Sequence, residues 1–412
     1  MLKDYFTWLK FPLNAILRRH KIFKKSVSRC LRISPKVRDM LHLPSRSSQG
    51  FLSWCSFNQC NDQWIETEPA SHFIHSLPKT NHPENLWYFR DNSQVNIDAS
   101  GLALLHNAYV HGHNGGQYLN SSKDFLWDLG RENWKYFDAF YMDSVWRLPA
   151  PVHLAGTVAV LADEYAYNNF SHWVFDVLPK IDVLKKANLF DRVDWFLVGH
   201  ASRPFQLDTL SRLCIPLKKV IQLTDSSFFR ADSIAIPRLC GYNRQHYPAR
   251  RLEFLANFFS DRTCNSKPSR KLFISRSDAS FRHLIGEDEL MKKLDRHGFE
   301  RISLSGLPLA NTVDLFMEAK AVIGPFGSGL MNIAFCQPRT AVVEIASPSF
   351  YNCYHWYLSG VRRLRHAVYF GNNGMLNPDK PPNQLTNDIK INAQSCYEFI
   401  CDYLREASPD LL

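Results

Sequence analysis

AVIGPFGSGLMN, at residues 321–332, joins an apolar, strand-like run to the start of a helix through three glycines. Glycine lets a backbone approach a phosphate closely, and a helix N-terminus supplies unpaired N–H groups and the positive end of a dipole. The stretch has neither the spacing of the dinucleotide fingerprint nor the Lys-Ser/Thr pair of a P-loop. It is compatible with a phosphate-binding turn and with a tight packing turn.

Strands and helices alternate on both sides of this turn. The predicted strands are Leu272–Ser275, Arg301–Leu304, Ala321–Gly324 and Ala341–Ala346. The predicted helices are Glu287–His297, whose first turn is acidic, Leu309–Lys320 and the short Leu330–Cys336. Such an alternation predicts a Rossmann-like half with a parallel sheet.

A second alternation precedes the first and predicts another parallel sheet. Its strands are expected at Thr157–Ala162, Asp194–Gly199, Lys219–Leu223 and Ser233–Pro237, with helices at 171–187 and 205–214. Asp261–Arg270 is polar and contains proline, which is typical of a linker. The predicted fold class is therefore α/β, with two Rossmann-like halves facing a ligand-binding cleft.

These patterns divide the 412 residues into four regions. We expect a basic segment at 1–50, an N-terminal Rossmann-like domain at 51–265, a C-terminal one at 266–372, and a tail at 373–412 with a helix at about 388–406. Residues 51–150 are rich in aromatic and polar side chains and give few clear elements.

The net charge of +10 is concentrated in residues 1–50, which contain 12 of the 49 basic residues and 2 of the 39 acidic ones. Aromatic and aliphatic side chains such as Phe6, Trp8 and Phe11 alternate with these cations. This pattern suits a helix on an anionic membrane surface, and equally a basic extension that packs on the body or is disordered. The balanced charge of residues 51–412 argues against a nucleic-acid partner.

Localisation is predicted from leader and cysteine patterns. Lys10 interrupts the first apolar run and no small-residue cleavage site follows it, so no secretory signal is expected. The 10 cysteines form no Cys-x-x-Cys pair, and free thiols in a reducing cytoplasm are favoured over disulfides. The sequence pattern for N-glycosylation, Asn-x-Ser/Thr, occurs at Asn120 and Asn169.

Asn169–Pro179, with the sequence NFSHWVFDVLP, is the strongest candidate for catalytic residues. On a helix, His172 and Asp176 share one face, and Asn169 lies on or near it. A histidine beside a carboxylate is a plausible general base with its orienting partner. A capping asparagine with a structural His–Asp contact is the alternative.

Three more residues follow or occupy the predicted strands. Arg276 and Arg282 follow the strand that ends at Ser275, where the carboxyl ends of parallel strands face a ligand crevice. Glu344 interrupts an apolar strand and needs a partner, either a ligand hydroxyl or a structural cation. No Asp-x-Asp pair and no zinc-like His/Cys spacing occurs, so no metal is predicted.

Four motifs, in order across 157–347, together resemble glycosyltransferase family 61. They are Asn-x-x-His-Trp-x-x-Asp-x-Leu-Pro at 169–179, Ile274-Ser275-Arg276 with Arg282, Gly-Pro-x-Gly-x-Gly-Leu-x-Asn at 324–332, and Val-Val-Glu-Ile at 342–345. The resemblance implies a GT-B-like fold, an inverting mechanism without a required metal, and a nucleotide-sugar donor, a UDP-sugar being one candidate.

Carried over to this chain, the resemblance assigns roles to the motif residues. Asp176 is the first choice of catalytic base and His172 the second. The expected substrate-binding residues are Asn169, Arg276, Arg282, Gly324, Gly327, Ser328, Gly329, Asn332 and Glu344, with the arginines and the turn on the diphosphate and Glu344 near the nucleoside. The chain departs from the family at Phe326, where histidine is common, and at Gly286, where asparagine is common.

The expected function is transfer of a sugar to a glycan or lipid-linked acceptor, in surface polysaccharide or lipopolysaccharide synthesis. No cofactor beyond the donor is expected. A catalytically silent nucleotide- or glycan-binding protein remains the alternative. An NAD-type oxidoreductase is disfavoured because no G-x-G-x-x-G occurs.

Overall fold

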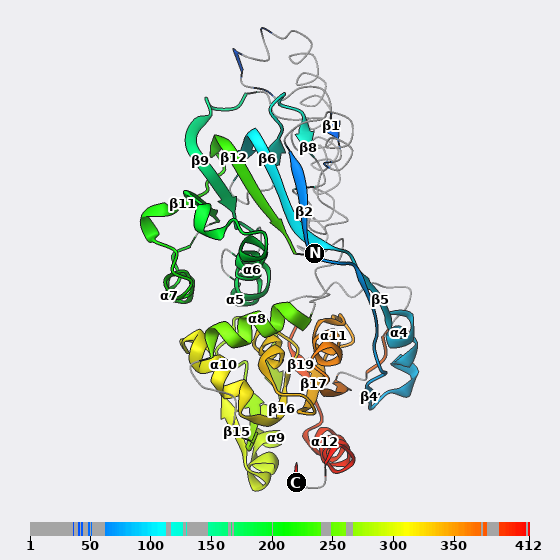
Figure 1. Ribbon diagram of the computed structural model, residues 1–412. Helices are drawn as coiled ribbons and strands as arrows, with labels where there is room; N and C mark the ends of the chain where they lie inside the picture. Colours follow the sequence, from blue (N-terminus) through cyan, green and yellow to red (C-terminus); the bar gives the residue numbers. More distant parts are fainter. Residues whose placement is uncertain are drawn as a thin grey trace, which may run out of the picture. The chain divides into compact units, whose positions relative to one another are not determined.

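The computed structural model is a mixed α/β structure of helices and several sheets (Figure 1). It describes residues 62–408 with gaps at 113–116, 127–128, 130–146, 164–165, 167–168, 200, 240–248, 261–266, 372–373 and 377–386, together with residues 36, 40–41, 43, 48–49, 51 and 411–412. Contacts divide the chain into an N-terminal unit (Met1–Glu68, Ser100–Asn168, Asp176–Tyr242) and a C-terminal unit (Pro69–Ala99, Asn169–Phe175, Asn243–Leu412).

The N-terminal unit is built on one mixed sheet. In spatial order its described strands are β1 (Ser48–Gln49), β8 (Phe125–Leu126), β7 (Gln117–Leu119), β6 (Ser100–His111), β12 (Phe228–Arg238), β9 (Val152–Val160), β10 (Trp195–Val198) and β11 (Val220–Gln222), with β2 (Gln63–Glu68) also paired to β6. Apolar side chains from β6, β9, β10 and β12 form its main core.

The predicted parallel sheet is only partly correct in this unit. β9 runs parallel to β10 and β12, and β10 runs parallel to β11, as the alternation predicted. However, β6 pairs antiparallel with β12, β2 and β7. β6 and its partners β2 and β7 come from residues 51–150, where the strand pattern is unclear because β6 is buried along most of its length and shows no alternation.

The C-terminal unit matches the predicted Rossmann-like half. Its sheet is parallel throughout and has the order β15 (Phe299–Ile302), β13 (Arg270–Ile274), β16 (Ala319–Pro325), β17 (Ala341–Ala346), β18 (Arg365–Phe370) and β4 (Lys79–Thr80). The inner strands β16 and β17 are apolar runs with almost every residue buried, as expected for a sheet covered on both faces.

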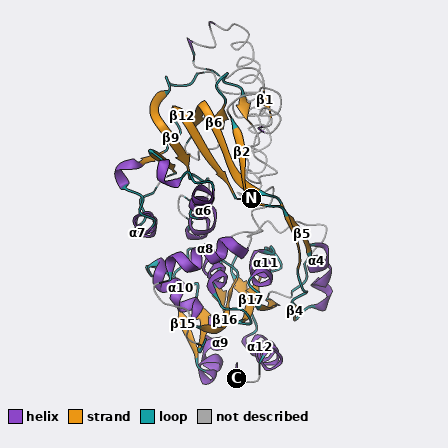
Figure 2. Cartoon of the chain, in the orientation of Figure 1, coloured by secondary structure: helices purple, strands orange, loops and turns teal. Residues whose placement is uncertain are grey.

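Helices lie on both sides of this parallel sheet (Figure 2). The described helices of the C-terminal unit are η1 (Pro83–Asn85), α4 (Leu86–Asp91), α5 (Phe170–His172), α8 (Ala249–Phe259), α9 (Glu287–Leu294), η6 (Asp295–His297), α10 (Leu309–Met317), η7 (Ser328–Phe335), α11 (Tyr354–Val361) and α12 (Ala393–Ala407). The predicted helices at 287–297, 309–320, 330–336 and 388–406 are therefore confirmed, with ends shifted by a few residues.

The helical region predicted at 171–187 is confirmed with a change of helix type. A π-helical turn, η3 (Trp173–Val177), lies between α5 and α6 (Pro179–Lys186). The other described helices of the N-terminal unit are η4 (Phe190–Arg192), α7 (Pro204–Arg212) and η5 (Leu217–Lys219). π-Helical turns are uncommon and often occur at functional sites.

An N-terminal segment completes the C-terminal unit. Pro69–Ala99, which the sequence grouped with the N-terminal domain, supplies β4 and the pair of β3 (Ser71–Ile74) with β5 (Gln94–Ile97). The Trp356 indole donates to the Ser76 carbonyl at 2.8 Å, and this hydrogen bond connects the segment to α11. One further small pair joins β14 (Leu284–Ile285) to β19 (Ile389–Lys390).

Several predictions concern residues outside this description. Most of the basic segment 1–50 and residues 261–266 of the predicted linker lie outside the described residues. Among the described cysteines, 214, 336, 353, 396 and 401 are free, as predicted, and all but Cys214 are buried. No helix in the described part of the chain has the length and apolarity needed to cross a membrane.

Candidate active site

The glycine turn lies between β16 and η7, at the carboxyl end of an inner strand. A Cβ on Gly327 would lie 2.1 Å from Arg276 Nη1, and one on Gly324 would lie 3.1 Å from Ile274 Cβ. Gly327 has an extended backbone with φ of 164°, which any residue adopts. The close approach of the Arg276 guanidinium, rather than backbone conformation, therefore favours glycine at position 327.

Arg276 is fixed beside this turn by its own loop. Its Nε donates to the Arg282 carbonyl at 3.2 Å, and its Nη2 donates to the Phe281 carbonyl at 2.9 Å. Burial lowers the pKa of Arg276, although Asp278 opposes this shift. Two backbone hydrogen bonds thus fix the Arg276 guanidinium in contact with the glycine turn.

Arg282 is surrounded by aromatic rings. Its guanidinium carbon lies 5.2, 5.4 and 5.7 Å from the ring centroids of Phe281, Phe326 and Phe350, within the range of cation–π attraction. Burial, followed by the charge of Arg276, lowers the pKa of Arg282 to about 10, so it stays charged at neutral pH. Its buried Nε has no hydrogen-bond partner among the described residues.

The two guanidinium groups form a candidate anion site at the ends of three neighbouring strands. Arg276 and Arg282 follow β13, Phe326 follows β16, and Phe350 follows β17. Neither arginine forms an ion pair with a carboxylate in the part of the chain that the structure describes. Two half-buried cations, of which only Arg276 has a nearby carboxylate among the described residues (Asp278), favour an anionic ligand such as a diphosphate.

Residues of the turn also stabilise η7. The Asn332 amide donates to the Gly329 carbonyl at 3.0 Å, and Asn332 is 1% exposed. The Ser171 hydroxyl donates to the Ser328 carbonyl at 3.2 Å, and the Phe175 ring stacks on Phe335. These contacts pack α5 against η7 within the C-terminal unit. Asn332 and the Ser328 carbonyl therefore have structural contacts that stabilise the turn.

Asn169 is the N-cap of α5. Its side-chain oxygen accepts from the N–H groups of Ser171 at 3.0 Å and His172 at 3.5 Å. This is the capping role that the sequence left open, and N-cap side chains of this type stabilise helix starts. The contact of Asn169 with substrate stays a prediction.

His172 and Asp176 lie one turn apart in the continuous helical segment formed by α5 and η3. Asp176 is 4% exposed and His172 is half-buried. Asp163, His172 and Asp176 each offer one atom that could bind a metal, and these three atoms lie within 4.8 Å of one another. The same proximity suits proton transfer between the imidazole and a carboxylate.

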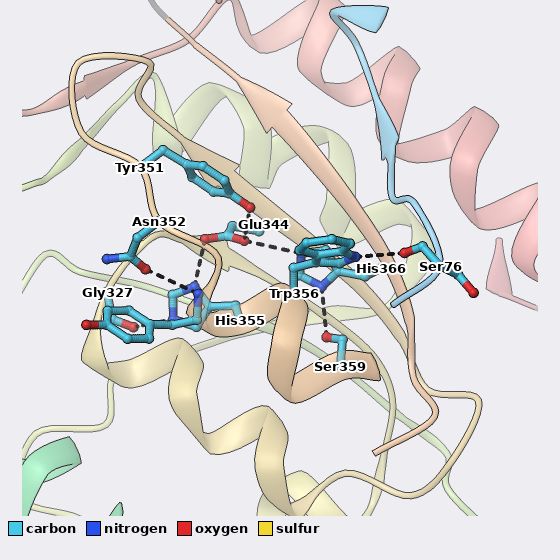
Figure 3. A network of polar contacts seen from close by, with 10 residues as sticks. Ser76, Gly327, Glu344, Tyr351, Asn352, His355, Trp356, Ser359 and His366 are labelled. Atoms are coloured by element: carbon cyan, nitrogen blue, oxygen red, sulfur yellow. Dashed lines mark hydrogen bonds and ion pairs between the residues drawn. The ribbon is translucent and has the colours of Figure 1, made fainter. Parts of the chain in front are cut away.

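Glu344 is buried in β17, and its partners belong to the protein (Figure 3). One carboxylate oxygen accepts from His355 Nδ1 at 2.7 Å, and the other from His366 Nε2 at 3.2 Å and the Tyr351 hydroxyl at 3.5 Å. Burial alone would raise the pKa of Glu344, but the two histidines outweigh it and the pKa is lowered. The structure therefore gives Glu344 the internal ion pair that the sequence left open.

The partners of Glu344 were not identified from the sequence. A carboxylate in an apolar strand signalled that a partner must exist, and two histidines lie 11 and 22 residues further along. No spacing rule connects residues of a strand, the helix after it and the next strand, because they meet only through the parallel sheet. The Phe350 ring beside Arg282 was missed for the same reason.

Gly286, a departure from the family pattern, has a local explanation. It precedes α9 with φ of 101°, in the left-handed region that glycine and asparagine adopt most readily. The next residue, Glu287, is buried and accepts from the Ser275 hydroxyl at 2.5 Å. The positive φ of Gly286 is thus compatible with either glycine or asparagine at this position.

Comparison with known proteins agrees with this geometry. Residues 170–343 match the family model described as Glycosyltransferase 61. The matched region includes α5, both arginines and the glycine turn. A search of curated proteins found no match. The match over residues 170–343 therefore supports the assignment to glycosyltransferase family 61 that the motifs indicated.

Proposed function

We propose that this protein is an inverting, metal-independent glycosyltransferase that moves a sugar from a nucleotide-sugar donor to a hydroxyl of a glycan acceptor. The observation that carries the proposal is the pair of guanidinium groups beside the glycine turn, neither of which forms an ion pair with a carboxylate among the described residues. A nucleoside diphosphate is the leaving group of such a donor, and its two phosphates match two fixed cations.

The arginines would act on the charge that develops during transfer. As the bond between the anomeric carbon and the diphosphate oxygen breaks, its electron pair stays on the diphosphate. Preorganised cations in a partly buried site stabilise this developing charge more than water does. Arg276, held by two backbone carbonyls, needs little reorganisation for this role.

The acceptor hydroxyl must lose its proton as its oxygen attacks the anomeric carbon. We assign Asp176 as the first candidate for the base and His172 as the second. Their place one turn apart supports a pair in which one group accepts the proton and the other orients it. Attack opposite to the leaving diphosphate inverts the configuration of the sugar.

We further propose that the two units form a GT-B-like enzyme, with the donor on the C-terminal unit and the acceptor on the N-terminal one. The acceptor would be a lipid-linked or other surface glycan, at the cytoplasmic face of a membrane that residues 1–50 contact. The parallel sheet of the C-terminal unit and the basic N-terminal sequence support this scheme. Nucleic acid is not an expected partner.

A silent nucleotide-binding protein is the second candidate. It is favoured by Phe326, which replaces the histidine common in the family and whose buried ring lies beside Arg282. An aromatic ring can help to hold the arginine but cannot transfer a proton. Binding without turnover would fit this alternative.

A panel of nucleotide sugars tests both candidates. Thermal shift of the full chain is expected to identify a stabilising nucleoside diphosphate, and the matching sugar nucleotide should be hydrolysed slowly without acceptor. The Asp176→Asn variant should bind the donor equally and lose hydrolysis. Stabilisation without hydrolysis in the wild type would support the silent protein, and no stabilisation by any donor would contradict both.

A further inference from the structure

A buried charged network lies behind the glycine turn. Glu344 stands in register with Gly324 on the neighbouring strand, and its carboxylate is 0% exposed. A buried carboxylate is costly unless it is paired and hydrogen-bonded. His355 from α11 and His366 from β18 supply those contacts.

The hydrogen-bond partners fix where the protons lie. His355 Nδ1 faces the Glu344 carboxylate, and its Nε2 faces the Gly327 carbonyl at 3.1 Å. Both partners only accept, so both ring nitrogens of His355 donate to them only when the imidazole carries both protons. His366 differs because its Nδ1 faces the Ser359 hydroxyl at 2.8 Å, which can donate as well as accept, so a neutral ring also satisfies its contacts.

Gly327 connects this network to the anion site. Its carbonyl accepts from His355 and from the Leu330 N–H at 3.0 Å, which is the first hydrogen bond of η7. Its Cα faces the guanidinium of Arg276, with no space for even a Cβ. The position of the Gly327 backbone therefore decides where the Arg276 guanidinium can lie.

We propose that His355, oriented by Glu344, is a positioning residue for diphosphate binding, because it fixes the Gly327 carbonyl behind Arg276. This inference rests on the proposed function and deepens it. His355 is buried and touches the turn rather than the donor, so its effect reaches the ligand through Gly327 and Arg276.

The network provides matched variants. His355→Ala removes the donor to Gly327, and we expect the Kd for diphosphate to rise about tenfold, which corresponds to one hydrogen bond from a charged group. His355→Gln keeps one N–H donor and should give an intermediate Kd. His366→Gln alters another partner of the same carboxylate without touching the turn, and its Kd should stay within about twofold of the wild type.

The measurement is titration calorimetry of the full chain with inorganic pyrophosphate and with UDP, below the melting temperature of each variant. In an Arg276→Ala background, His355→Ala should cause no further loss, because its effect passes through Arg276. An independent loss in that background, or an unchanged Kd in His355→Ala, would overturn the inference. If His355→Ala does not fold, the comparison of His355→Gln with His366→Gln decides in the same way.

The proposed function and this inference fail differently. A wild-type chain that binds neither probe would remove both. If the wild type binds pyrophosphate or UDP and the His355→Gln variant binds with equal affinity, the proposed anion site is supported. The role of His355 is then contradicted.

Discussion

At the scale of single residues, Arg276 and Arg282 carry the functional argument, and we expect each change to alanine to weaken donor binding. A charge-assisted contact contributes about 1.5–3 kcal/mol, so the Kd for a nucleoside diphosphate should rise about tenfold or more. Calorimetry on the purified variants measures this. Arg270→Ala is the matched control, because Arg270 pairs with Glu300 and Glu318 and has no link to the turn. Unchanged affinity in both site variants would refute the assignment.

A second residue-scale prediction concerns the pH dependence of stability at His366. Burial lowers the pKa of His366, although Glu344 opposes the shift. Below the unfolded pKa of about 6.5, the unfolded chain therefore binds a proton that the folded chain does not. The wild type should lose stability relative to His366→Gln as pH falls from 7.5 to 5.5, by up to about 1.4 kcal/mol.

Denaturant unfolding of both chains across this pH range gives the comparison. The difference between the two free energies of unfolding isolates His366 from other groups that titrate in the same window. A difference that is constant with pH would show that His366 has the same pKa in the folded and unfolded chains.

At the scale of elements, we expect a side chain at Gly327, between β16 and η7, to weaken diphosphate binding. A Cβ would lie 2.1 Å from Arg276 Nη1, so Gly327→Ala must displace that guanidinium. We expect the diphosphate affinity to fall as far as in Arg276→Ala. Gly306→Ala is the control, since φ of 82° strains it but no atom lies within 4 Å of the added Cβ. Similar affinities in the two glycine variants would contradict this account.

The elements that could be predicted from the sequence are those with a clear hydrophobic pattern or with glycines at their boundaries. β17 has the predicted bounds because Ala341–Ala346 is an uninterrupted apolar run. The turn after β16 was identified because glycines separate a strand from a helix. β6 was missed, since it is buried along most of its length without alternation and its sequence contains Ser, His and Asn. β4 has only two residues. It pairs in parallel with β18, which lies far along the sequence, and no local pattern encodes such a long-range pairing.

The site was predicted to a similar extent. Arg276, Arg282 and the turn lie together because residues that follow neighbouring parallel strands share one edge of the sheet. Glu344 was correctly expected to need a partner, but the choice between a ligand and a histidine depends on side-chain packing. Roles of Asn169, His172 and Asp176 towards substrate stay predictions.

At the scale of the whole reaction, we expect turnover without a divalent metal. In the proposed complex the two arginines would supply positive charge at the diphosphate, which is the task a metal performs in other transferases. Donor hydrolysis in the presence of a chelator should proceed at the untreated rate. Loss of activity in chelator and its return with manganese would overturn the prediction, and would direct attention to Asp163, His172 and Asp176 as ligands.

The distribution of charge over the whole chain predicts a membrane tether in residues 1–50. The complete net charge of +10 lies there among aromatic and aliphatic side chains, whereas residues 51–412 are balanced. Each Lys or Arg near an anionic surface contributes about 1 kcal/mol, reduced by salt. The full chain should therefore co-sediment with anionic liposomes at low salt, while a chain that starts at residue 51 should not. Because nucleic acid attracts the same cations, binding to duplex DNA serves as the control and should be weaker than binding to vesicles. Equal sedimentation of both chains, or of neither, would show that residues 1–50 do not hold this glycosyltransferase-family protein at a membrane.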